Sequence, residues 1–165
     1  ARESRVLIKF HIERLESLLP QGKSVDDIIA AQIAFGFARE STEPDETDTG
    51  VIRIYPMTGS WSSSGPTSWS DINEAFDSQT ELGLVDLPPH IIPHPPGSKQ
   101  FGVPLTLGTP LSLGRSEALV NQVRSWHAGP SSNDGVVLIA DVVPGLHGDQ
   151  RVFLMNIAAI RVTLR

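Results

Sequence analysis

Two runs of alternating apolar residues near the end of the chain constrain its fold more than any other feature. They span Val136–Val143 and Val152–Leu164. In the second run one face carries Leu154, Asn156, Ala158, Ile160, Val162 and Leu164. A period of two residues predicts strands. The eight-residue connector Pro144–Arg151 is too short for a parallel crossover, so the runs are predicted to form an antiparallel hairpin.

Other segments with the same period predict further strands. They are Arg5–Ile12, Ala31–Phe37, Val51–Tyr55 and Phe101–Leu113. Pro104 and Pro110 restrict the last of these to an edge strand or a bulged pair, because proline cannot donate to a sheet ladder.

Helical signals are few and short. Glu13–Pro20 has the apolar spacing of a single turn, and Ser70 is a candidate cap for a short helix over Asp71–Phe76. Ser24 followed by Asp27 resembles an N-cap with an acid at the third position. Arg115–Ala128 has one apolar helical face, with Ser116 as a possible cap and Gly129 as a possible end, but helix and strand both remain open there.

Proline and polar residues mark the connections. Leu87–Gly97 contains five of the chain's 13 prolines, so it is predicted to be an extended connector. Ser41–Gly50 and Thr58–Ser68 are predicted loops. With no helix–strand alternation, the pattern predicts one mainly β domain over residues 1–165. The pattern favours an antiparallel β-sandwich or barrel with one or two short helices and long proline-rich loops.

Composition excludes several chemistries. The 165 residues include no cysteine, which removes disulfides, thiolate metal sites and cysteine nucleophiles. No apolar run approaches the roughly 20 residues of a membrane span, so no membrane partner is expected.

The net charge of −6 is unevenly distributed. Glu40–Ser98 has ten acids and one base, whereas the rest of the chain is slightly basic. Because phosphate binding needs clustered bases, any contact with nucleic acid is expected to come from the termini.

Searches for local catalytic motifs give no candidate. There is no phosphate-binding glycine loop, and the serines of Gly59–Gly65 lack the spacing of a nucleophile elbow. His90 and His94 are four apart, but Pro93 forbids the regular helix that would bring them together. His11, His127 and His147 are far apart in the sequence.

Weaker candidates have ordinary explanations that we favour. Asp141, within an apolar strand, is expected to face solvent, and the acidic residues of Glu40–Asp48 lack the spacing of an EF-hand calcium loop. The aromatic residues that could form a ligand platform are more often core or interface residues: Tyr55, Trp61, Trp69 and Trp126. We therefore predict that the chain has no catalytic residue, cofactor or metal, and that it is not an enzyme.

One resemblance rests on the C-terminal runs. The segments Gly135–Gly145 and Gly148–Leu164 resemble the closing strand pair of jelly-roll coat proteins of small icosahedral viruses. Those proteins have a glycine-led apolar strand, a glycine turn and a long alternating final strand. The resemblance implies a jelly-roll-like β-sandwich and a subunit that associates with copies of itself in a virion shell. It also implies that nucleic acid binds only through a terminal basic arm, which is not present in this chain.

A second hypothesis remains open: a β-sandwich or barrel ligand-binding module, or a small enzyme with a loop-built site. That hypothesis places Trp61, Trp69, His90 and His94 around a cleft.

Overall fold

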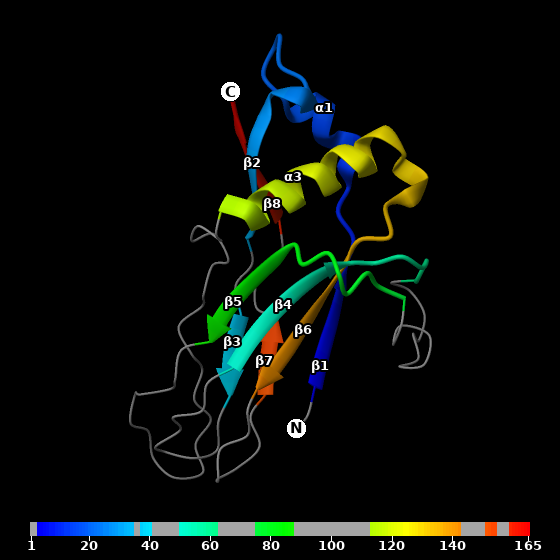
Figure 1. The fold of residues 1–165 in the computed structure, drawn as a ribbon. Helices are drawn as coiled ribbons and strands as arrows, with labels where there is room; N and C mark the ends of the chain where they lie inside the picture. Colours follow the sequence, from blue (N-terminus) through cyan, green and yellow to red (C-terminus); the bar gives the residue numbers. More distant parts are fainter. Residues whose placement is uncertain are drawn as a thin grey trace.

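The fold is built mainly from strands in antiparallel sheets, as the sequence predicted, together with two helices in the part of the chain that is described (Figure 1). The computed structural model describes residues 3–34, 37–40, 50–62, 75–87, 113–142, 151–154 and 159–165. The predicted strand over 101–112, most of the predicted helix over 71–76, the loop over 41–49 and the proline-rich connector beyond Leu87 lie outside these ranges.

The larger sheet has the strand order β1-β6-β4-β5, with every neighbouring pair antiparallel. Its strands are β1 (Glu3–Ile8), β6 (Val136–Val142), β4 (Gly50–Pro56) and β5 (Gly83–Leu87). The predicted strand over Val51–Tyr55 is therefore confirmed. The first predicted strand ends early, at Ile8, and β5 was not predicted because its glycine and aspartate weaken the pattern of a strand.

The remaining strands pair in two short ladders. In one, β2 (Ile28–Ala34) pairs with β8 (Ala159–Leu164); in the other, β3 (Phe37–Glu40) pairs with β7 (Arg151–Leu154). Consecutive segments of the early chain thus pair with consecutive segments of the late chain.

The predicted C-terminal hairpin is wrong. Both edges of β6 are occupied, since Leu138 lies opposite Val6 of β1 and also opposite Ile54 of β4. A strand has only two edges for hydrogen bonding, so β6 cannot also pair with β7 or β8. The short connector suggested neighbours, but the two runs belong to different sheets.

The segment between β1 and β2 consists of tight turns. It contains η1 (Ile12–Arg14), α1 (Leu15–Leu18) and η2 (Val25–Asp27), where η denotes a 3₁₀ turn. The predicted turn over Glu13–Pro20 is confirmed. The capping prediction is confirmed as well, because the Asp26 N–H donates to Ser24 Oγ and the Ser24 N–H donates to Asp27 Oδ2 at 2.9 Å.

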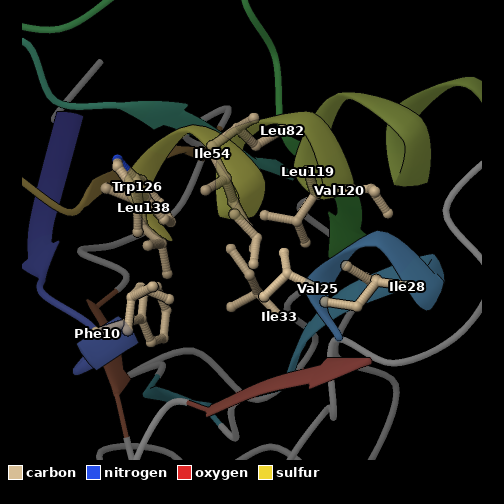
Figure 2. Close-up of a cluster of buried hydrophobic side chains, with 14 of the residues drawn as sticks. Phe10, Val25, Ile28, Ile33, Ile54, Leu82, Leu119, Val120, Trp126 and Leu138 are labelled. Carbon is tan, nitrogen blue, oxygen red and sulfur yellow. The ribbon is translucent and has the colours of Figure 1, made fainter. Parts of the chain in front are cut away.

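The segment that the sequence left open is a helix, α3 (Leu113–Ala128), which begins earlier than the suggested cap at Ser116. Its apolar face is buried through Leu119, Val120, Val123 and Trp126. Figure 2 shows side chains of α3 pointing toward Ile54 of β4 and Ile33 of β2, so the helix, the larger sheet and the β2–β8 ladder contribute to one apolar core.

The chain just before β6 is fixed by an unusual glycine. Gly135 has φ +81°, and a Cβ added there would lie 2.1 Å from the Ile8 carbonyl oxygen. The buried Asn133, after η3 (Pro130–Ser132), donates through Nδ2 to the Phe10 carbonyl at 2.8 Å and accepts from the Gly135 N–H. This junction holds the end of β1 against the start of β6.

Gly135→Ala is expected to lower the free energy of unfolding by about 3 kcal/mol or more, because it adds a backbone clash to an unfavourable φ. Gly22→Ala is the matched control, because the φ of Gly22 is +80° but nothing lies within 4 Å of the added Cβ. Its free energy of unfolding is expected to fall by only about 1 kcal/mol. Urea unfolding of both variants measures the difference. Equal losses would contradict the close approach of β1 to Gly135.

Candidate functional site

An open apolar groove lies between the turns after β1, α3 and β8. Its lining residues are Phe10, His11, Ile12, Leu15, Leu18, Val123, Ile160 and Val162, and its volume is about 140 Å³. Ile160 and Val162 reach it because every second residue of β8 faces inward. Leu18 at the groove is 78% exposed, which leaves a large apolar side chain in solvent.

Two histidine–glutamate pairs flank η1 and α1. His11 Nδ1 lies 2.9 Å from Glu13 Oε1, and His127 Nε2 at the end of α3 lies 3.1 Å from Glu16 Oε1. The pKa of the Glu13 carboxyl is held below its ordinary value. The main cause is a hydrogen bond from the residue's own backbone N–H, and the hydrogen bond with His11 is the second. Each histidine therefore has its own glutamate, and exposed pairs of this kind contribute little to stability.

A separate cluster of aromatic and apolar side chains lies on the face of the larger sheet that points away from the main core. This outer-face cluster comprises Met57 and Val137 with the partly buried Leu7, Tyr55, Trp61, Ala75, Phe76 and Ile139. The Tyr55 and Phe76 ring centroids are 5.5 Å apart, and the Arg5 guanidinium lies 5.2 Å from the Phe76 centroid. The Trp61 Nε1–H donates to the Asp134 carbonyl at 2.6 Å.

The aromatic platform considered from the sequence is only partly assembled. Tyr55 and Trp61 share the outer-face cluster, whereas Trp126 is fully buried in the main core and Trp69 lies outside the described residues. Phe76 and Arg5 were not singled out by the sequence. The odd numbering of Arg5 and Leu7 on β1 was the one signal that they share a face.

The other candidates from the sequence do not form a site that the structure describes. His90, His94 and His147 lie outside the described ranges, as does the acidic loop beyond Glu40. Asp141 lies on β6, opposite Glu3 of β1 and Val51 of β4. Within the described ranges, no three histidine, aspartate or glutamate side chains are placed to hold a metal ion, and no helix is long and apolar enough to cross a membrane.

Two carboxylates make local hydrogen bonds that lower their pKa values. The Ser24 N–H lowers the pKa of Asp27, and the Thr80 hydroxyl, followed by the Gln79 N–H, lowers that of Asp77. A depressed folded-state pKa gives stability that is present above the unfolded value and is lost as the pH falls through the folded value.

Acidification from about pH 5 to about pH 2 is therefore expected to lower the urea midpoint, because Asp27 and Asp77 must be protonated. Asp27→Asn and Asp77→Asn should be less stable than the parent at neutral pH and should converge with it in acid. Glu117→Gln, at an exposed position of α3, is the control. If the variants keep the parent's full acid slope, these hydrogen bonds are not its source.

Comparison of the chain with protein-family models, with curated proteins and with solved structures gives no match. Function must therefore be argued from the sheets, the groove and the exposed surface themselves. The groove and the outer-face cluster are apolar and aromatic features. His11 in the groove lining has Glu13 as a partner, but neither feature includes a serine or threonine nucleophile among its described residues.

Proposed function

We propose that this chain is a structural subunit that associates with copies of itself, in the manner of a virus-type coat protein, and that it has no catalytic role. The observation that carries the proposal is the exposure of large apolar side chains. Leu18 is 78% exposed and Ile29 is 55% exposed. Leu18 adjoins the apolar lining of a groove, so it is part of a contiguous apolar patch rather than a single exposed residue, and such patches are characteristic of interaction sites.

A jelly-roll-like sandwich is part of the same proposal. Its support is one buried cluster that includes residues of two sheets: Ala31 and Ile33 of β2, and Ile52, Ile54 and Leu138 of the larger sheet. Two sheets that face each other over one apolar layer are the basis of a sandwich. The described strands do not close the sheets, and α3 covers part of the core.

The pattern that resembled coat proteins gives this proposal little support. The two C-terminal runs were expected to pair with each other, but β6 pairs with β1 and β4, while β7 and β8 pair with β3 and β2. The proposal therefore depends on the exposed surface. The coat-protein form of the proposal also includes a location in the virion and contact with a genome through a basic arm.

The second candidate is a ligand-binding module or small enzyme, for which the groove at Leu18 is the relevant observation. Pockets for drug-sized ligands commonly have volumes from about 300 Å³ upward. The groove offers about 140 Å³ and is open to solvent, so it suits one apolar side chain better than an enclosed ligand. This comparison favours association between proteins.

Light scattering coupled to size-exclusion chromatography, with negative-stain microscopy, tests the proposal. Over a range of salt and pH we expect concentration-dependent species larger than one chain, and closed shells if the coat form is correct. A chain that stays monomeric at high concentration contradicts the proposal. A small molecule that is found by screening to bind the chain would favour the second candidate, the ligand-binding module.

Leu18→Asp is expected to weaken association about tenfold or more, because a buried leucine contributes about 1.5–3 kcal/mol at an interface. The fall is expected without loss of folding, since Leu18 is exposed in the single chain. Gln21→Asp, at an exposed position close by, makes the same charge change and should have little effect. Equal behaviour of the two variants in dilution experiments would exclude Leu18 from the interface.

A further inference from the structure

Strand β1 ends the larger sheet and has the properties of an edge that can pair again. No strand in the described part of the chain pairs with its outer side. Its register with β6 is regular from Glu3 to Ile8, without a bulge, and it contains no proline. Such an edge presents unpaired backbone donors and acceptors to another strand.

The opposite edge of the same sheet is less suitable. Strand β5 is shorter than β1, begins at Gly83, and is followed at once in the sequence by Pro88 and Pro89. Proline and short length are two of the features that protect natural sheet edges from pairing. The outer side of β1 has neither feature.

We propose that β1 pairs in antiparallel orientation with β1 of a second copy, across a two-fold axis at Val6. This inference deepens the proposed self-association by naming one of its interfaces, and it rests on that function. The product is a continuous sheet of two copies, in the order β5-β4-β6-β1 followed by the partner's β1-β6-β4-β5. A two-fold contact of this type uses the same surface in both copies and is closed.

Charge along the strand selects the register. A two-fold axis perpendicular to the sheet keeps each face of β1 on the same side in both copies. Facing residues must therefore both be odd-numbered or both be even-numbered, which is possible only if the axis passes at a residue and not between two residues. Centring on Val6 places Glu3 opposite the partner's Lys9 at both ends. Centring on Arg5 places the two arginines opposite each other, and centring on Leu7 places Arg5 opposite the partner's Lys9.

A register centred on Ser4 is also disfavoured. It would set Val6, Leu7 and Ile8 beyond the end of the partner's β1, and its favourable charge pair would need Arg5, whose guanidinium already lies over the Phe76 ring. The register centred on Val6 covers the whole strand and uses Lys9, which is exposed. Opposite charges on facing strands stabilise a pair, and like charges destabilise it.

The position of Glu3 strengthens this choice. In the sheet, Glu3 lies opposite Asp141 of β6, so two acidic residues occupy neighbouring positions. The proposed pairing adds the partner's Lys9 on the other side of Glu3.

Charge reversal tests this interface, with dimer dissociation measured by dilution in light scattering or analytical ultracentrifugation. We expect a species of twice the 17.9 kDa chain mass. Glu3→Lys or Lys9→Glu alone should raise the dissociation constant about tenfold, because two favourable pairs become repulsive. The double variant Glu3→Lys/Lys9→Glu should restore the parent value. Glu117→Lys on α3 makes the same charge change as Glu3→Lys and should leave dissociation unchanged.

The outcomes separate this interface from the proposed function. Association that neither single reversal weakens, or that the double variant does not restore, overturns the pairing of β1 and leaves self-association standing. A parent chain that remains monomeric overturns both. A restored dimer that forms nothing larger supports the interface and excludes a shell. Circular dichroism of each variant confirms that the chain is folded, so a loss of structure cannot be mistaken for a loss of pairing.

Discussion

The central position of β6 is the constraint on which the rest of the fold depends. Its outer neighbours β1 and β4 occupy both of its edges, and the junction of Asn133 and Gly135 fixes where it begins. Since β6 has no edge left, the final part of the chain must find other partners, and it pairs with β2 and β3. One face of β6 then meets α3 and the second sheet in the main core, while the other carries the outer-face cluster.

The sequence predicted what short-range chemistry determines. The Ser24–Asp27 cap, the apolar face of α3 and the strand at Val51–Tyr55 all depend on residues within a few positions of one another. The choice of strand partners depends on residues far apart in the sequence, because period-two alternation identifies a strand without identifying its neighbour. The C-terminal hairpin was wrong for this reason, and β5 was missed because its glycine and aspartate weaken the local pattern, although the strand pairs with β4.

The candidate surfaces show the same division. The sequence grouped Tyr55, Trp61, Trp69 and Trp126 as a possible platform and favoured core or interface positions for them. Trp126 is buried in the main core, whereas Tyr55 and Trp61 lie in the outer-face cluster. The groove combines Phe10, Val123 and Ile160, which belong to three distant parts of the chain, so no local spacing could have revealed it. Exposure of Leu18 likewise follows from the packing of α1 rather than from the residue's own hydrophobicity.

The pairing of the first strand with one of the last strands affects how the chain can be made. Glu3 of β1 lies opposite Asp141, and Ile28 of β2 lies opposite Leu164, so the two earliest strands have their partners near the end of the sequence. During synthesis, β1 and β2 leave the ribosome long before those partners exist. Neither sheet can be completed until translation of this region is nearly finished. This region should therefore fold slowly, and only after its last strands have been synthesised, since pairing of distant strands requires costly loop closure.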